Sequence, residues 1–411
     1  MTEQDKKSKK TEFYWGFPVG ELEDEQTSAR TEKESGVALI IAIMIISTIV
    51  IFTTDMIINS SVNLQLAVAN RDNIKAEYVA KSGANLSLFL ISADWGVDLF
   101  QYQMQNKKPS DSPQDIWAAI NGLPIGAESM EMAMGMADKL NLSKVNDEGA
   151  INQMQLFDGT FVIDVQDEGS KINLNYCVES RAEECMSMIE LLMSCPAERS
   201  FMEGKKITPK EIAANIKDWV DDNSRITDGS SYSGESDPYI DRTPKVRPKN
   251  APFDSIEELK MVAGWDDDLQ RIFAPYFTIY PIPKIGLQAK PKINLNSANR
   301  ELIQCLMPES ALRCAEKAAK FLVRAEKDDP PEVLGDDAGI QKRLSEIFCE
   351  DDKKKTNWFT YYTDVFRVVS TGIVGDQTVR LDTVVQRAMP DDIEKNEGFK
   401  GTYKYLYWKM L

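Results

Sequence analysis

The stretch SGVALIIAIMIISTIVIFTT, residues 35–54, decides the fold of this chain, because it holds twenty consecutive residues without a charge. At about 1.5 Å per residue, a helix of this length spans ~30 Å, the thickness of a bilayer's hydrocarbon core. It lacks the polar face that a core helix of a globular protein shows. Basic residues precede it, so the sequence predicts a single-pass anchor with a cytoplasmic amino terminus and the remaining chain outside the cytoplasm.

The helical pattern continues well beyond the apolar stretch. No proline occurs between Pro18 and Pro109, and a secretory signal peptide would have a shorter apolar core followed by a cleavage site. Apolar or small residues recur at steps of three, four or seven, at Val62, Leu66, Ala69, Ala76, Ala80, Gly83 and Leu86. The pattern predicts one helix from Val37 to about Leu90, with its first half in lipid and its second half against a domain.

The composition excludes several classes of function. There are 65 acidic and 48 basic residues, a net charge of −17, which disfavours nucleic-acid binding because that requires a cationic surface. The chain has no histidine, so histidine-dependent hydrolysis and histidine-ligated metals are excluded. No carboxylate pair stands out as catalytic, and we predict a protein that is not an enzyme.

Six cysteines follow the apolar stretch, and none forms a CxxC pair. An oxidising compartment would favour disulfides, whereas reduced buried thiols are the alternative. Six cysteines allow 15 connectivities, and the sequence does not choose among them. The possible disulfide residues are Cys177, Cys185, Cys195, Cys305, Cys314 and Cys349.

Strand patterns flank a long helical region, which predicts an α+β fold. Residues 159–175 alternate apolar and polar residues around Glu168-Gly169, as a hairpin would, and residues 361–388 predict a second hairpin around Gly375-Asp376. From about residue 179 to 355 the periodicity is helical. The string KINLN occurs at 171–175 and again at 292–296, and we interpret the first copy as a sheet strand rather than a repeat of the second.

An acidic loop at residues 218–241 is a candidate metal site. Calcium takes six to eight oxygen ligands from such carboxylates in flexible geometry. The spacing does not fit an EF-hand, since Ser224 and Ile226 would occupy its first ligand positions. A solvated loop without metal is the alternative. The candidate ligands are Asp218, Asp221, Asp222, Asp228, Glu235, Asp237 and Asp241.

Two further segments leave their role open. INLNSANRELIQCL, residues 293–306, resembles the first half of a helix-hairpin-helix, with Asn296 or Ser297 as the helix cap. The hairpin glycine of DNA-binding versions is missing, which favours a structural hairpin. The aromatic tail YKYLYWKML, residues 403–411, is either an interaction segment or the edge of a core.

The string GVALIIAIMI after Gly36 and the later KAEYVAKSGAN, residues 75–85, resemble K-type minor pseudopilins of type II secretion. DWVDDNSRITDG, RPKNAPFDSIEELKMVAG and KINLNSANRELIQCL, at residues 218–229, 247–264 and 292–306, extend the resemblance. It implies prepilin peptidase cleavage between Gly36 and Val37, N-methylation, and calcium at the acidic loop. Ile41 stands where most pilins have a glutamate, which implies a subunit at the filament tip.

The resemblance also implies an architecture and partners. The expected segments are a leader at 1–36, a long helix at 37–95 that is transmembrane in its first half, a pilin-like α/β part at 96–178, an inserted helical domain at 179–355, and C-terminal strands and a tail at 356–411. The expected partners are I- and J-type minor pseudopilins, prepilin peptidase and the inner membrane, with no nucleic acid. A membrane-anchored DNA-binding protein of helix-hairpin-helix type and a minor pilin of a type IV pilus are the alternatives.

Overall fold

The structure is a computed structural model, and all structural statements below concern the part of the chain it describes. These residues are 13–14, 17–18, 34–126, 159–178, 182–195, 199–228, 230, 233–240, 246–282, 292–306, 333–336, 338–340, 342, 358–387 and 403–411. The chain divides into two compact units, residues 1–68 and 69–411, which are described separately.

The first unit consists of two short strands and the beginning of a long helix. Strands β1 (Phe13–Tyr14) and β2 (Phe17–Pro18) pair antiparallel. Helix α1 (Glu34–Gln105) runs for 72 residues without interruption and belongs to both units. Its side chains are exposed on every face from residue 36 to 68, and it is long and apolar enough to cross a membrane. The single helix predicted from 37 to about 90 is confirmed, and it extends 15 residues further.

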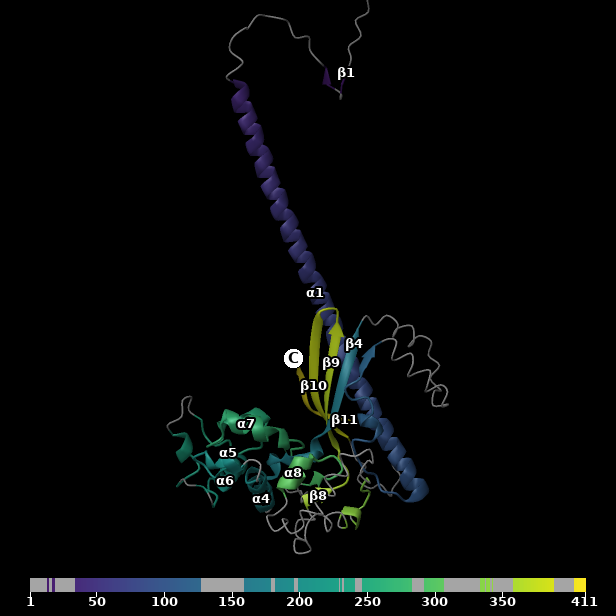
Figure 1. Cartoon of the computed structure of the whole chain (residues 1–411), viewed down its shortest axis with the longest axis vertical. Coiled ribbons are helices and arrows are strands. Elements are labelled where there is room, and N and C mark those ends of the chain that lie inside the picture. The colour runs from purple at the N-terminus through teal and green to yellow at the C-terminus, as the bar shows by residue number, and fades with distance from the viewer. Residues whose placement is uncertain are drawn as a thin grey trace, which may run out of the picture. The chain divides into compact units, whose positions relative to one another are not determined.

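A five-stranded antiparallel sheet forms one part of the second unit (Figure 1). Its order is β11 (Tyr403–Met410), β10 (Gln377–Arg387), β9 (Val365–Val374), β4 (Thr160–Asp167) and β3 (Pro124–Gly126). The predicted hairpin at Gly375-Asp376 is confirmed, and Gly375 takes the positive φ of 55° that the tight turn requires. The aromatic tail is therefore an edge strand of the sheet.

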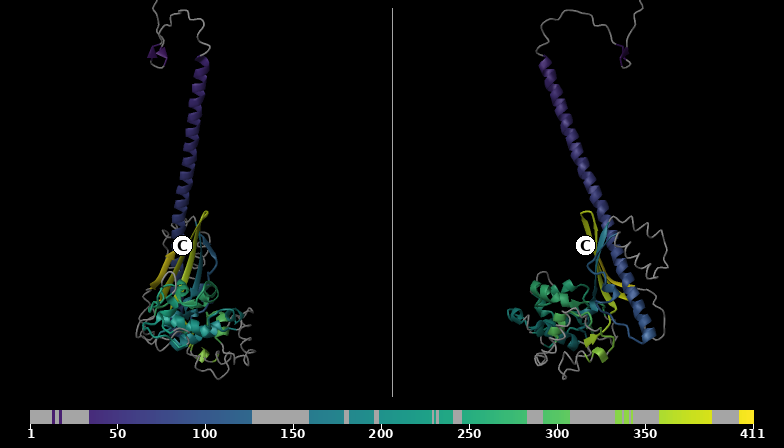
Figure 2. Two further views of the ribbon diagram at one scale, coloured as in Figure 1. Left: turned by 90° about the vertical axis from the view of Figure 1, so that its left-hand side faces the viewer. Right: turned by 45° about the vertical axis from the view of Figure 1, so that its right-hand side comes forward.

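The second half of α1 packs against one face of this sheet (Figure 2). Small residues bring the two backbones together: a Cβ added to Gly372 would lie 2.2 Å from the carbonyl oxygen of Ala76 and 2.6 Å from the amide nitrogen of Ala80. A Cβ added to Gly83 would lie 2.2 Å from Ser370 Oγ. The small residues of the predicted helix stripe thus mark where the helix crosses the sheet most closely.

Helical segments, most of them short, make up the rest of the second unit. All but residues 116–118 and 168–170 contribute to a large apolar core that includes Met188, Ile216 and Phe253, all fully buried. The α-helices are α4 (Ala182–Met193), α5 (Arg199–Glu203), α6 (Pro209–Val220), α7 (Asp267–Phe273) and α8 (Arg300–Cys305). The 3-10 segments are η1 (Ile116–Ala118), η2 (Glu168–Ser170), η3 (Leu174–Tyr176), η5 (Asp237–Tyr239), η6 (Ile256–Met261) and η7 (Ala274–Tyr276).

The two KINLN strings begin two repeats of one arrangement. In the first repeat, residues 171–282, strand β5 (Ile172–Asn173) pairs parallel with β6 (Phe277–Thr278). In the second, residues 292–361, strand β7 (Ile293–Asn294) pairs parallel with β8 (Phe359–Thr360). We interpreted the first copy as a strand and not as a repeat of the second. The first copy does form a strand, but it is also a repeat, so that part of the interpretation was wrong.

The hairpin predicted at residues 159–175 is also wrong. Asp167 Oδ1 accepts a hydrogen bond from the backbone N–H of Gly169 (2.7 Å), and residues 168–170 form η2 in place of a two-residue turn. This changes the direction of the chain, so that β4 stays in the five-stranded sheet while β5 pairs with β6.

One asparagine holds each repeat together. Asn175 accepts from the N–H of Phe253 (2.7 Å) and donates to the carbonyl oxygens of Phe253 and Ile279 (3.1 and 2.8 Å). Asn296 accepts from the N–H of Leu334 (2.9 Å) and donates to the carbonyl oxygens of Leu334 and Tyr361 (2.9 and 3.2 Å). Each side chain satisfies three backbone groups that would otherwise lack partners.

This role replaces the capping role predicted for Asn296 or Ser297. Asn299 caps α8 instead, because its side chain accepts from the N–H of Glu301 (2.8 Å). The predicted cap was therefore two or three residues too early, because residues 295–298 form a turn between strand β7 and the helix.

Two disulfides lie in the helical part. Cys177–Cys185 closes a short loop inside the first repeat, whereas Cys195–Cys305 joins the first repeat to the second. These four cysteines are among the six predicted as possible disulfide residues. Cys314 and Cys349 lie outside the described residues.

Candidate functional site

Helix α6 brings the first two candidate ligands to its carboxyl end. Thr208 caps the helix by accepting from the N–H of Glu211 (3.2 Å), and Pro209 stands at the first turn, where its missing N–H costs nothing. The apolar face of α6 packs into the core, which places Asp218 in the last turn and Asp221 at the C-cap. The helix thus presents two carboxylates at the start of the acidic loop.

Three of the predicted ligands are buried together. Asp218, Asp221 and Glu235 are only 5%, 3% and 5% exposed. Both carboxylate oxygens of Asp221 and Oε1 of Glu235 have no hydrogen-bond partner within the described residues. Asp218 is partly satisfied, since both its oxygens lie within 3.3 Å of the backbone N–H of Thr227.

Burial and mutual repulsion act on the same three groups. Burial raises the pKa of Glu235, and the negative charges of Asp218 and Asp221 raise it further. Burial also raises the pKa of Asp218 and of Asp221. The one nearby cation is Lys217, whose Nζ lies 3.8 Å from Asp221 Oδ2, and it partly opposes these shifts. The cluster therefore favours the binding of positive charge.

The other candidate ligands are placed differently. Asp222, Asp228 and Asp237 are exposed, and Asp241 lies outside the described residues. In the described part of the loop, the acidic side chains do not form a group of three that converges on one point. The structure thus selects Asp218, Asp221 and Glu235 as the inner carboxylates of the loop and assigns no inner position to the three exposed ones.

A residue outside the acidic loop, Asn250, ties this loop to the domain. Asn250 takes a positive φ of 48° and donates through Nδ2 to the carbonyl oxygen of Asn223 (2.6 Å) and to Glu235 Oε2 (3.5 Å). Asparagine tolerates this left-handed backbone better than most residues, which is the one feature of the sequence that could have indicated it. Oxygens of a carboxylate trio with unmet bonding capacity fit a hard cation such as Ca²⁺, which takes oxygen ligands.

The predicted processing residues lie within α1. Gly36, Val37 and Ile41 are all exposed in the first unit, and the described geometry does not bear on their role. Nearly all of the predicted leader, residues 1–36, lies outside the described residues.

Comparisons with known proteins point in one direction. Residues 170–282, which coincide with the first repeat, match the family described as "Type II secretion system (T2SS), protein K". A Type II secretion system protein K from Klebsiella pneumoniae is 19% identical over 245 residues, which are 59% of this chain and 62% of that protein. The match thus spans less than two thirds of that relative.

The fold has a solved counterpart. A chain in the crystal structure of the GspK-GspI-GspJ complex from the enterotoxigenic Escherichia coli Type 2 Secretion System is similar, with a TM-score of 0.53 and 14% identity. The similarity covers 84% of this chain and 98% of the other. It extends the likeness from the first repeat to the α+β architecture of nearly the whole chain.

Proposed function

Because the chain is GspK-like in the sequence of its first repeat and in its fold, we propose that it is a minor pseudopilin at the tip of the type II secretion pseudopilus. In that role it supports pseudopilus initiation and protein export across the outer membrane. The observation that carries the proposal is the fold: an apolar helix continues into a pilin-like sheet, and two helical repeats are inserted between β4 and β9.

The exposed side of α1 supports a role in assembly. Ile74, Tyr78, Phe89 and Phe100 are each more than half exposed, whereas the opposite side of the helix covers the sheet. Large apolar residues that share one face of a helix are typical of contact surfaces. This face is where I- and J-type minor pseudopilins would pack, as the complex of the similar structure suggests.

The position of the chain in the filament is part of the proposal. The apolar segment of α1 anchors the chain in the inner membrane by a single span, and the second unit lies in the periplasm. Prepilin peptidase cleaves between Gly36 and Val37, and the new terminus is methylated. Ile41 leaves no intramembrane carboxylate to pair with a neighbour above, which suits a terminal subunit.

We also propose that the acidic loop binds calcium. Asp218, Asp221 and Glu235 supply inner carboxylates, and the remaining oxygens come from the rest of residues 218–241. The unpartnered buried oxygens of Asp221 and Glu235 support this assignment, because an unpaired buried carboxylate is costly without a cation. The ion orders the loop and performs no chemistry. No catalytic role is proposed for the chain.

The test is the intact mass and N-terminal sequence of the chain recovered from native membranes, together with crosslinking to I- and J-type subunits. We expect a methylated chain that begins at Val37 and that crosslinks from residue 78. Tyr78→Asp should abolish the crosslinks at neighbouring positions of α1. Thr378→Asp, the same charge on an exposed strand residue, is the matched control. A chain that keeps residues 1–36 and crosslinks to neither subunit would overturn the proposal.

The alternatives are less well supported. A DNA-binding helix-hairpin-helix would need helices around a glycine hairpin, whereas α8 is six residues long and its repeat is joined through Asn296. A type IV pilus subunit would not account for the similarity to protein K at residues 170–282.

A further inference from the structure

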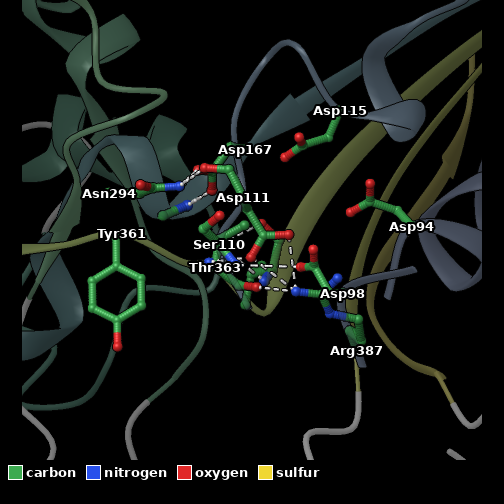
Figure 3. A network of polar contacts seen from close by, with 12 residues as sticks. Asp94, Asp98, Ser110, Asp111, Asp115, Asp167, Asn294, Tyr361, Thr363 and Arg387 are labelled. Carbon is green, nitrogen blue, oxygen red and sulfur yellow. Dashed lines mark hydrogen bonds and ion pairs between the residues drawn. The ribbon is translucent and has the colours of Figure 1, made fainter. Parts of the chain in front are cut away.

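A second acidic cluster lies where α1 ends. Asp94 and Asp98 come from α1, Asp111 and Asp115 from the segment after it, and Asp167 from the end of β4 (Figure 3). The ordered cation among them is Arg387, at the end of β10. This cluster belongs neither to the acidic loop nor to the exposed face of α1, and the proposed function does not use it.

Arg387 forms an ion pair with one of these aspartates, Asp111, while its Nε and Nη1 have no hydrogen-bond partner among the described residues. Its Nη2 donates to both oxygens of Asp111 (3.0 and 2.9 Å) and to the carbonyl oxygen of Thr363 (2.7 Å). Its guanidinium group stacks on the rings of Trp95 and Phe366, 4.6 and 5.2 Å from their centroids. Arg387 and Asp111 are both fully buried. The pair therefore neutralises itself and leaves the remaining aspartates without a hydrogen-bonded cation.

The other aspartates of the cluster accept hydrogen bonds from backbone N–H groups and lie near one another. Asp94 Oδ1 accepts from the N–H of Ile116 (3.3 Å), Asp98 Oδ2 from that of Ser110 (3.3 Å), and Asp115 Oδ2 from that of Ser112 (2.6 Å). Asp94 is 5% exposed, and its Oδ2 has no hydrogen-bond partner among the described residues. Lys107 acts on Asp115 from a distance, and Asp167 is held by Asn294 (2.8 Å).

Four carboxylates remain in this space, and those of Asp94 and Asp167 are buried, so that a cation or a proton is needed to neutralise part of their charge. A divalent cation such as Ca²⁺ takes six to eight oxygen ligands. Among the described residues, the acidic loop has three buried carboxylate oxygens without a hydrogen-bond partner, on Asp221 and Glu235, whereas this cluster has one, on Asp94. A proton needs only one buried carboxylate oxygen that is free and surrounded by like charge, which Asp94 Oδ2 provides.

We propose that Asp94 binds a proton at neutral pH and that Asp94 and Asp98 form a proton-dependent clasp that holds the end of α1 to residues 110–116. The geometry carries this assignment: Asp94 and Asp98 accept from the N–H groups of Ile116 and Ser110 across the contact. Asp115 accepts from Ser112 within the segment, and a proton on Asp94 reduces the repulsion among the three carboxylates.

The electrostatics agree with this arrangement. Burial, with the charges of Asp115, Asp111 and Asp98, raises the pKa of Asp94 to about 8, and Arg387 opposes the shift only in part. Burial and the charges of Asp111 and Asp115 raise the pKa of Asp98 to about 7. In the unfolded chain both groups titrate near the ordinary value of 3.8.

The sign of the linkage follows from these directions. Between the ordinary value and about pH 8 the folded chain binds more protons than the unfolded chain, so the free energy of unfolding falls as pH rises. The clasp is therefore tightest in mild acid and loosest above about pH 8, where Asp94 is ionised. This is opposite to the behaviour of an ordinary carboxylate paired with a cation.

The test is thermal unfolding of the full chain in detergent from about pH 6 to about pH 9, with infrared spectroscopy of the carboxylic acid carbonyl band. We expect the wild-type Tm to fall by about 2 °C per pH unit. Asp94→Asn, which mimics the protonated group, should flatten this slope and raise the Tm at about pH 9. Asp376→Asn, in the exposed β9–β10 turn, should follow the wild type.

The infrared readout does not depend on the stability of a variant. Wild-type protein at pH 7 should show a protonated carboxylic acid band that disappears on titration to about pH 9. Its absence at pH 7 would overturn the proposal. A second overturning result is a rise in Tm at about pH 9 on adding Mg²⁺ or Ca²⁺ to an Asp221→Asn background, lost again with Asp94→Asn, because the cluster would then take a cation.

Discussion

In the first repeat the bridging asparagine, Asn175, is fully buried, whereas in the second repeat its counterpart Asn296 is half-buried. Both make the same three hydrogen bonds to two distant backbone segments. The same two-residue parallel pairing precedes each of them. A short KINLN string therefore organises two folding units through long-range contacts rather than through its own secondary structure.

The two repeats differ in the segments that lie between the bridging asparagine and its backbone partners. Between the bridging asparagine and the backbone segment it holds, the first repeat places α4, α5, α6 and the acidic loop, and the second has a much shorter connection. The preceding asparagines differ as well. Asn173 donates to the carbonyl oxygen of Pro281 (3.0 Å) inside its own repeat. Asn294 donates to the carbonyl oxygen of Asp111 (2.9 Å) and to Asp167 Oδ2 (2.8 Å). The first repeat thus carries the candidate cation site, and the second connects to the segment after α1 and to the end of β4.

The largest expected effect comes from the disulfide that joins the repeats. Cys195 and Cys305 are 110 residues apart, so the loop-entropy argument gives about 5 kcal/mol for this crosslink. Cys177 and Cys185 are 8 residues apart, and the same argument gives about 2.5 kcal/mol. We expect the Cys195→Ser/Cys305→Ser pair to lower the free energy of unfolding about twice as much as Cys177→Ser/Cys185→Ser in urea titrations of the full chain.

Each disulfide variant serves as the control for the other, because both remove two sulfurs, one pair from within the first repeat and the other from the link between the repeats. Equal losses would mean that the repeats hold together without the crosslink and would contradict this account of their junction.

A smaller effect is expected from the bridging asparagines. Asn175→Ala leaves three buried backbone groups without partners, each costing about 1–3 kcal/mol, of which part is recovered by relaxation. We expect a loss of about 4 kcal/mol for Asn175→Ala and about 2 kcal/mol for Asn296→Ala, whose surroundings admit water. Hydrogen exchange at Phe253 and at Leu334 should report each loss locally. An equal cost at both positions would show that burial does not distinguish the two repeats.

We expect calcium to stabilise the first repeat and to leave the second unchanged. At a free concentration of about 100 times its Kd, a ligand that binds only the folded state stabilises it by about 2.7 kcal/mol. We expect calcium to slow hydrogen exchange in residues 209–240 and to leave residues 292–306 unchanged. Asp221→Asn should remove the response, and Asp254→Asn, an exposed acid of the same repeat, should keep it. A response in both repeats would contradict the assignment of the loop.

The sequence predicted the parts of this fold that depend on local pattern. The long helix followed from apolar spacing, and the β9–β10 hairpin followed from Gly375-Asp376. The repeats did not, because β5 and β7 are two residues long and carry no periodicity. The partners of Asn175 lie 78 and 104 residues further along the chain, a distance that no pattern in a single sequence encodes.

The candidate site shows the same limit. The sequence located the acidic loop, but Asp221 and Asp222 are adjacent and chemically identical. Only the end of α6 decides that the first is buried and the second exposed. Asp94 and Asp98 were passed over because a helix with two carboxylates four residues apart normally presents them to water, and here residues 110–116 cover them.

The smallest expected effect is that of a substitution at Glu235, which should change the free energy of unfolding in opposite directions without and with calcium. Burial and the charges of Asp218 and Asp221 raise the pKa of Glu235, so in the metal-free chain its ionised form opposes folding at every pH above its ordinary value of 4.5. In chelator at neutral pH, Glu235→Gln should therefore raise the free energy of unfolding by a small amount. With calcium the sign reverses, because the variant loses a ligand. Thermal unfolding with and without calcium measures both. A variant less stable than wild type in chelator would show that Glu235 is a structural hydrogen-bond acceptor for Asn250 rather than an inner ligand of the first repeat.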